Sequence, residues 1–187
     1  MSFKIQLIIF IVFILGCQNK DSKIDKKNYA NDSIKPIQQT PEKNKKIIET
    51  VKKFGTKISP TYKQAVCTEL VIGVLEKFEY LDDIDRKRIR IIANENIHTL
   101  IQGNSPIPQG VYYALIEKGI GIPIDKENVL EGDFVQFWTN TWGHCGIVKK
   151  MDLEKNEMEL YSSFPSTNGY GVQKFNIPEY CYFVRLK

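Results

Sequence analysis

The hydrophobic pattern changes its period at Gly121, and this change restricts the possible fold more than any other feature of the chain. Before Gly121, apolar residues recur at helical spacing, as in residues 47–54. After it, apolar and polar residues alternate in short runs that turn residues separate. Helices followed by a strand meander predict an α+β domain, in which N-terminal helices pack on an antiparallel sheet of five or six strands.

The same patterns predict the individual elements. A first helix ends at Gly55, a second covers about residues 62–80, and residues 83–101 are helical in part. A short helix over residues 110–118 ends at Gly119. The predicted strands cover residues 133–138, 144–151, 157–164, 172–175 and 181–186.

The N-terminus carries an export pattern. Lys4 precedes the apolar run Ile5–Gly16, which is shorter than the roughly 20 residues that a membrane span needs. Cys17 follows this run directly and, with Gly16 before it, resembles the lipobox of bacterial lipoproteins. The resemblance implies a signal peptide over residues 1–16, cleavage before Cys17 and a lipid on its thiol. It places the protein in the bacterial cell envelope, on the outer membrane or the periplasmic face. An uncleaved anchor helix is the alternative.

Charge separates a tether from a domain. Residues 18–46 carry eight Lys against four Asp or Glu, whereas residues 47–187 carry 17 Lys or Arg against 18 Asp or Glu. The polar segment 17–41 is predicted to be a flexible tether, and 42–187 a single domain. The nearly neutral domain argues against nucleic-acid binding, while the basic tether allows attraction to an anionic membrane or to acidic wall polymers. We expect a monomer.

The cysteine count predicts a free thiol. With Cys17 assigned to a lipid, Cys67, Cys145 and Cys181 remain. An odd number of thiols in an exported protein predicts that at least one is unpaired. Cys145 and Cys181 could form a disulfide or could both be buried thiols, and we favour buried thiols.

Cys67 and His144 have the surroundings of a catalytic pair. A thiol nucleophile needs a base, a site that favours the thiolate and a group that orients the imidazole. Cys67 lies where a helix begins or is under way, and His144 lies where a strand begins. We therefore predict Cys67 as the nucleophile and His144 as the base. Cys145 alternates with His144 and should face the core. His98 has no motif around it and is expected to be an ordinary surface or core residue.

Two neighbouring segments resemble a known family. The sequences Glu131–Trp138 (EGDFVQFW) and Gly143–Val148 (GHCGIV) are similar to a strand pair of the NlpC-type cell-wall cysteine peptidases, relatives of the CHAP amidases. The resemblance implies a rearranged papain-like fold and hydrolysis of peptide amides in peptidoglycan. Cys67 matches the nucleophile of the family and His144 the base, and Asp133 matches a structural Gly-Asp turn. We expect no metal or cofactor, because Cys and His pairs at ligand spacing are missing.

The chain departs from the family in two places. Val66–Glu69 (VCTE) replaces the usual Asp-Cys-Ser-Gly. The family also has a polar residue, often charged, that orients the imidazole. If residues 150 and 157 flank the hairpin turn, Ser163 faces His144 in this role, and a one-residue change of register would substitute a neighbour. Asn168 is a more distant candidate.

Several residues are candidates for substrate binding. Gln136 and Trp138 share one face of their strand and are expected near His144, where Gln136 could donate to an oxyanion or to the substrate. Trp138 and Trp142 could form the walls of a groove. Tyr62 precedes the cysteine helix, where the family often contacts substrate. Ordinary sheet packing is the alternative for the strand residues.

These features predict a membrane-anchored thiol hydrolase that cleaves a peptide amide bond, with peptidoglycan peptides as its substrate. The departures at Val66–Glu69 and the uncharged third group suggest an alternative, which is a catalytically weak or inactive lipoprotein that binds the wall or a partner on the same fold. An acyltransferase that uses the same thiol is a third interpretation, which sequence does not separate from a hydrolase.

Overall fold

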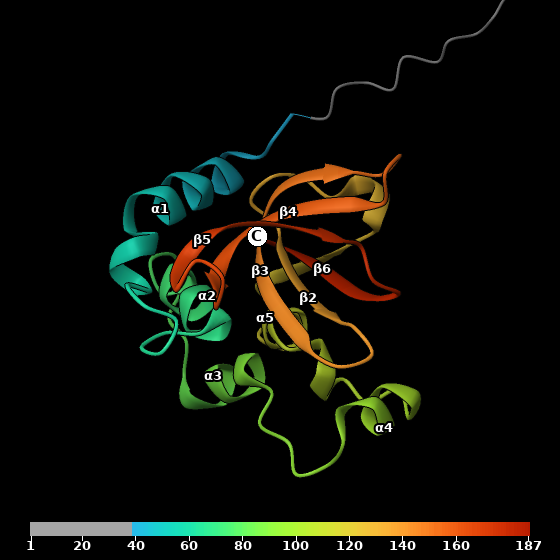
Figure 1. Cartoon of the computed structure of the whole chain (residues 1–187). Helices are drawn as coiled ribbons and strands as arrows, with labels where there is room; N and C mark the ends of the chain where they lie inside the picture. The colour runs from blue at the N-terminus through green and yellow to red at the C-terminus, as the bar shows by residue number, and fades with distance from the viewer. Residues whose placement is uncertain (1–38) are drawn as a thin grey trace, which may run out of the picture. The chain divides into compact units, whose positions relative to one another are not determined.

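A computed structural model of the protein describes residues 39–187 (Figure 1). The predicted signal peptide, Cys17 and most of the predicted tether lie outside these residues. Within residues 39–187, no helix combines the length and the apolar character needed to cross a bilayer. The elements, in chain order, are α1 (Glu42–Ile58), α2 (Cys67–Leu75), α3 (Asp83–Arg90), α4 (Ile97–Gln102), the 3₁₀ helix η1 (Ile107–Gln109), α5 (Val111–Glu117), β1 (Gly121–Ile124), the 3₁₀ helix η2 (Lys126–Asn128), β2 (Phe134–Trp138), β3 (Gly143–Asp152), β4 (Glu157–Phe164), β5 (Gly169–Asn176) and β6 (Tyr180–Leu186).

The described strands form one six-stranded sheet in the order β1-β6-β2-β3-β4-β5. Every neighbouring pair is antiparallel. The predicted α+β class is therefore confirmed, and so are the five predicted strands. The sixth strand, β1, pairs only with β6 and contains Pro123. A proline lacks the N–H that an inner strand needs, so its place at the edge of the sheet is the expected one.

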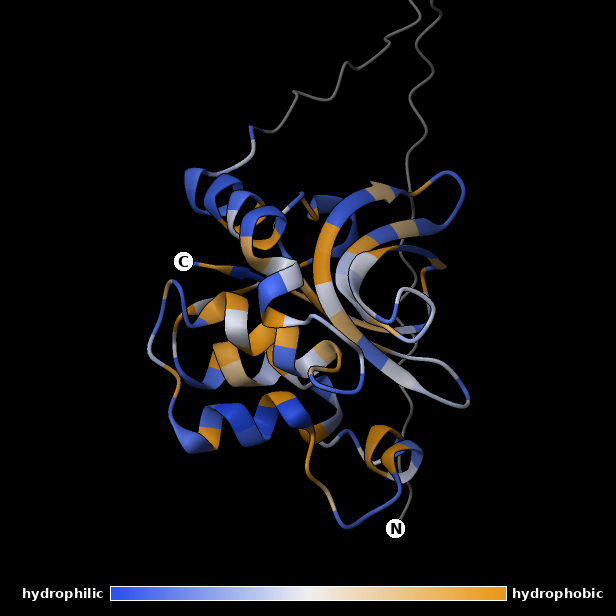
Figure 2. Cartoon of the chain, turned by 60° about the vertical axis from the view of Figure 1, so that its left-hand side comes forward, coloured by the Kyte–Doolittle hydropathy of each residue, from blue (hydrophilic) through white to orange (hydrophobic). Residues whose placement is uncertain are grey.

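The two faces of the sheet are buried in different ways. On one face, apolar residues of α1, α2 and α5 pack against Phe134, Cys145 and Ile147. On the other face, the curved sheet closes over its own side chains, among them Phe137 and Phe164. Figure 2 shows the helices gathered on one side and the curved strands on the other. Because successive strand residues point to opposite faces, neighbours in sequence belong to different cores.

Gly55 does not end the first helix, so that prediction is wrong. It lies inside α1, which continues to Ile58. A Cβ atom added to Gly55 would lie 2.5 Å from the ring of Tyr170 in β5. The missing side chain therefore allows α1 to pack closely on Tyr170, which offsets the low helix propensity of glycine.

Helix α2 is much shorter than predicted, and Cys67 is its first residue. The chain before it forms a turn, and Val66 is extended. The carbonyl oxygen of Ala65 accepts hydrogen bonds from the hydroxyl groups of Ser59 and Ser163. These side chains hold Ala65 outside the helix, so that the helix begins at the cysteine.

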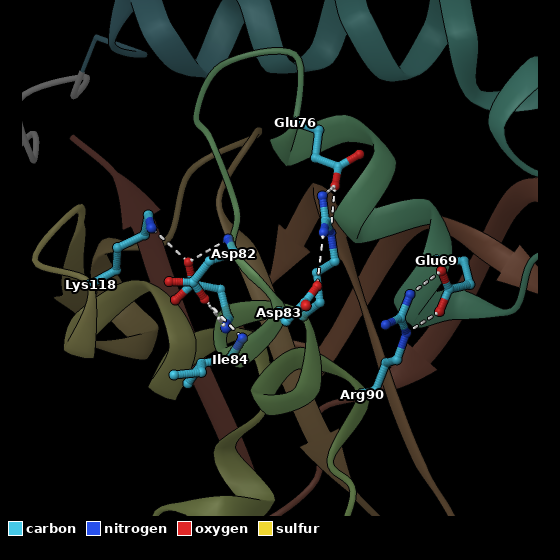
Figure 3. A network of polar contacts seen from close by, with 9 residues as sticks. Glu69, Glu76, Asp82, Asp83, Ile84, Arg90 and Lys118 are labelled. Carbon is cyan, nitrogen blue, oxygen red and sulfur yellow. Dashed lines mark hydrogen bonds and ion pairs between the residues drawn. The ribbon is translucent and has the colours of Figure 1, made fainter.

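Ion pairs join α2 to α3 (Figure 3). Arg90 donates two hydrogen bonds to the carboxylate of Glu69, at 2.7 and 2.9 Å. Arg86 donates to Glu76 at 2.9 Å. Glu69 belongs to the segment where the sequence departs from the NlpC-type pattern, and the structure gives this departure a structural role. Its pairing with Arg90 fixes the first turn of the helix that carries Cys67.

Asp133 is fully buried at the turn before β2. Its carboxylate accepts two hydrogen bonds from Arg185, both at 2.7 Å, and one from the side chain of Asn44 at 2.8 Å. Gly132, at φ 92°, has no room for a Cβ atom, which would lie 2.7 Å from the backbone oxygen of Asn44. The Gly-Asp pair therefore joins the start of β2 to β6 and α1, in line with the predicted structural role.

Candidate functional site

Cys67 occupies the first position of α2 and is partly exposed. The free backbone N–H groups and the dipole at a helix N-terminus favour negative charge there. Part of its surface packs against the core on the helix face of the sheet. The start of this helix therefore supplies the thiolate-favouring position that a nucleophilic cysteine needs.

His144 is the second residue of β3 and is only 7% exposed. Its ring stacks on Phe164, with 4.9 Å between centroids and 17° between planes. Phe137 and Phe175 lie at 5.9 Å. The Nε2 atom is buried and has no hydrogen-bond partner among residues 39–187. An aromatic enclosure thus holds the imidazole, where the NlpC-type family uses a polar group.

The thiol of Cys67 is acidic. Hydrogen bonding from the thiol of Cys145 lowers its pKa most, burial opposes this, and the hydrogen bond and charge of His144 lower it further, to about 4. The pKa of Cys145 is raised well above its ordinary value by its hydrogen bond to Cys67 and by burial. Cys67 therefore carries the negative charge near neutral pH, while Cys145 keeps its proton.

An open groove of about 390 Å³ lies beside this pair. Tyr62, Trp142 and His144 line it, so the structure brings three predicted site residues together. Burial and the charge of Cys67 raise the pKa of Tyr62. Cys67 itself is not among the lining residues, and His144, which lines the groove and lowers the pKa of Cys67, connects the two. The remaining walls of the groove include Phe164, Pro165, Ser166, Gln173 and Phe175.

Ser163 does not face His144. The β3–β4 ladder pairs Ile147 with Tyr161, and continuing this register places Phe164 opposite His144. The hairpin turn is flanked by Asp152 and Glu157 and not by residues 150 and 157, which shifts the register by two residues, and a bulge between Val148 and Lys150 reverses one of these two steps.

The hydroxyl of Ser163 instead donates to the carbonyl oxygen of Ala65 and lies 2.7 Å from the hydroxyl oxygen of Ser59. Asn168 is exposed in the following turn, at φ 48°, and is not among the residues that line the groove. Neither predicted orienting group contacts the imidazole, since its Nε2 atom has no partner in the described part of the chain.

Gln136 and Trp138 lie on the helix face of the sheet, opposite the face that carries His144. Phe137 pairs with His144, whereas Gln136 pairs with Cys145. Gln136 is 2% exposed beneath Gly110, and the indole N–H of Trp138 donates to the carbonyl oxygen of Pro108 at 2.6 Å. Their expected place near His144 is therefore wrong, because residues 136 and 138 alternate with 137. Their contacts are those of sheet and loop packing.

Cys145 is the functional residue that sequence reasoning missed. Alternation correctly predicted that it faces the core, but the core at this point includes the first turn of α2, and hence Cys67. Cys181 pairs with Phe137 and lies on the opposite face from Cys145, so these two thiols are too far apart to form a disulfide. Both are free thiols, and burial raises the pKa of Cys181 to about 12.

Three comparisons with known proteins complete the description of this site. Protein-family models, curated proteins and solved structures were compared with the chain, and none of them matches it. Within residues 39–187, no group of three or more His, Cys, Asp or Glu side chains is placed to hold a metal ion.

Proposed function

We propose that residues 42–187 form a thiol hydrolase, with Cys67 as nucleophile and His144 as general base. The observation that carries this proposal is the acidic thiol of Cys67, which lies at a helix N-terminus between a buried thiol, an imidazole and an open groove. A cysteine with a pKa of about 4 is almost entirely thiolate at neutral pH. The thiolate is the form that attacks a carbonyl carbon.

In the proposed reaction, His144 takes the proton of Cys67, and the sulfur attacks the carbonyl carbon of the substrate. The carbonyl electron pair moves to the oxygen. When the intermediate collapses, the C–N bond breaks and His144 gives its proton to the departing amine. The acyl group remains on Cys67 as a thioester. Water then attacks this thioester, His144 takes a proton from it, and the carboxylic acid leaves with the thiol restored.

The proposed substrate is a peptide amide bond in peptidoglycan. This part of the proposal comes from the sequence, since a lipid on Cys17 and a tether of about 25 residues would hold the domain near the wall. We also propose that the fold is a rearranged papain-like domain of the NlpC type. Its support is the chain order, in which a helix that begins with the cysteine precedes an antiparallel strand pair that carries the histidine.

One observation favours the alternative, a wall-binding or partner-binding protein with little or no activity. The Nε2 atom of His144 has no partner among the described residues, so this side of the ring lacks the polar group that would orient it. Acyl transfer is the third candidate, in which an amine or hydroxyl group replaces water in the second step.

The full chain, purified in detergent, tests the proposal. It should release fragments from muropeptides, and Cys67→Ala should abolish this release. Cys181→Ala is the matched control, because this partly buried thiol lines a different cavity, beside Asp125 and Glu179, and should leave activity unchanged. Iodoacetamide should label Cys67 near about pH 6. A wild-type chain that is inactive and unlabelled would contradict the proposal, and wall binding that survives Cys67→Ala would support the alternative.

A further inference from the structure

Apart from the imidazole of His144, the groove is lined without any side chain that carries a charge. None of the nine described residues on its wall is Asp, Glu, Lys or Arg. A cavity of about 500 Å³ elsewhere on the domain has Asp125, Lys126 and Glu179 on its wall. Burying a charged group without a partner is costly, so a wall without Asp, Glu, Lys or Arg selects against charged ligands. The groove is therefore suited to an uncharged group.

The polar atoms of the wall are few, and some are already paired. The hydroxyl of Ser166 donates to the side-chain oxygen of Gln173 at 3.0 Å. The Nε2 atom of His144 is buried and has no partner among the described residues. Tyr62, Trp142 and Gln173 add uncharged polar groups to the wall. An uncharged ligand can therefore find hydrogen-bond partners here, whereas a charged ligand meets no Asp, Glu, Lys or Arg.

Most of the wall is aromatic. Trp142 is 44% exposed, and its ring meets Phe137 edge-on at 5.5 Å and lies 6.0 Å from Phe175. Phe164 closes the other side of His144. An apolar group in the groove would remove the exposed face of Trp142 from water and contact rings that the protein already holds in place. A volume of about 390 Å³ is at the lower end of ordinary ligand pockets, which begin near 300 Å³.

We propose that this groove binds the acyl part of the substrate, and that the acyl part is uncharged and largely hydrophobic. The inference rests on the proposed thiol hydrolase and adds its specificity. The acyl chain would lie along Trp142 and Phe175 while its carbonyl carbon reaches Cys67. Substrates with a carboxylate or an ammonium in this position would bind poorly.

Nitrophenyl esters test this specificity, because their release of nitrophenolate reports acylation of Cys67. The full chain in detergent is mixed with the acetyl ester, the octanoyl ester and an ester of the same length that ends in a carboxylate. Each buried methylene is worth about two- to fourfold in binding. We expect the octanoyl ester to acylate Cys67 at least about tenfold faster than the acetyl ester, and the carboxylate ester to lose this gain.

Variants of the protein distinguish binding in the groove from partition of the esters into detergent micelles, because this partition is the same for every variant. Trp142→Ala should reduce the preference for the octanoyl ester to less than about threefold, mainly through KM. Val172→Ala should preserve it, since Val172 is 40% exposed on β5 but points away from the groove. Gln173→Lys should raise the rate with the carboxylate ester.

The possible outcomes distinguish the two proposals. Equal rates for all three esters, or a chain-length preference that Trp142→Ala does not alter, would overturn the hydrophobic groove and leave the thiol hydrolase intact. No acylation of Cys67 by any ester would overturn the hydrolase.

The groove remains testable in that case. In a chain with Cys67→Ala and Trp138→Phe, Trp142 is the single tryptophan, and octanamide should change its fluorescence, whereas octanoate should not. An unchanged signal with octanamide would overturn the groove as well.

Discussion

The thiol of Cys145, buried in β3, belongs to the core against which Cys67 packs at the first position of α2. Hydrogen bonding from Cys145 is the largest cause of the low pKa of Cys67, ahead of the imidazole of His144. Burial keeps Cys145 protonated, so it acts as a donor and does not compete as a nucleophile. The acidity of Cys67 thus has two separable sources, from successive residues of one strand.

Cys145→Ala should raise the pKa of Cys67. A hydrogen bond to a charged group is worth about 1.5–3 kcal/mol, which corresponds to a rise of about one to two pKa units. Because the thiolate is the reactive form, alkylation of Cys67 by iodoacetamide between about pH 3 and pH 9 measures the midpoint. The wild-type midpoint should lie near 4, and the variant should react more slowly just above that pH. Cys145→Ser should restore part of the lowering of the Cys67 pKa. An unchanged midpoint in Cys145→Ala would contradict the role of Cys145 as a hydrogen-bond donor.

His144→Ala should abolish general-base catalysis while Cys67 can still form a thiolate at high pH. Loss of its hydrogen bond and charge raises the pKa of Cys67, but Cys145 remains as a donor. Alkylation at about pH 9 should therefore persist, because the thiolate still forms there. Hydrolysis should fall by about 100- to 10,000-fold, the usual contribution of a positioned general base. Hydrolysis within about tenfold of wild type would show that His144 is not the base.

Asp133→Ala should destabilise the fold through Arg185. Removing one member of a buried ion pair leaves the other uncompensated and costs about 3–5 kcal/mol. The fully buried carboxylate also accepts from Asn44, which joins α1 to the sheet. Urea unfolding should show a lower midpoint for Asp133→Ala and for Arg185→Met. The double variant should be more stable than the sum of the two losses predicts, and simple additivity would contradict the pairing.

Gly55→Ala should be destabilising although alanine is the better helix former. The added Cβ atom would lie 2.5 Å from Cδ2 and Cε2 of Tyr170 and 2.7 Å from Cγ, which is close to the backbone, so the ring cannot simply swing away. Overpacking of this kind costs about 1–3 kcal/mol, against a gain of about 1 kcal/mol in helix propensity.

Thermal unfolding should show a lower Tm for Gly55→Ala, and Tyr170→Ala in the same chain should make the substitution at position 55 neutral or stabilising. Lys53→Ala, on the exposed surface of α1, is the control and should change stability by no more than about 0.5 kcal/mol. A Gly55→Ala chain as stable as wild type would show that the contact is not tight in solution.

The predicted ranges of helices and strands were correct where the sequence pattern that defines them is local. Alternation along β4 predicted its range, Glu157–Phe164, without error. The range of α2 failed, because the apolar period continues past both of its ends. The helix starts at Cys67 because hydroxyl groups from Ser59 and from Ser163, about a hundred residues away, hold the carbonyl oxygen of Ala65. The local spacing of apolar residues cannot predict contacts between residues that are so far apart in the chain.

The sequence alone determined the α+β class, the five longer strands, and Cys67 and His144 as the candidate pair. These follow from local periods and from the residues next to each position. Only the tertiary structure decided what surrounds the pair. The position of the β3–β4 turn, together with one bulge in β3, places Phe164, not Ser163, opposite His144, because each step of register turns a side chain to the other face. The packing of α2 on β3 places the thiol of Cys145 against Cys67, a contact between residues far apart in the chain, which no local pattern encodes.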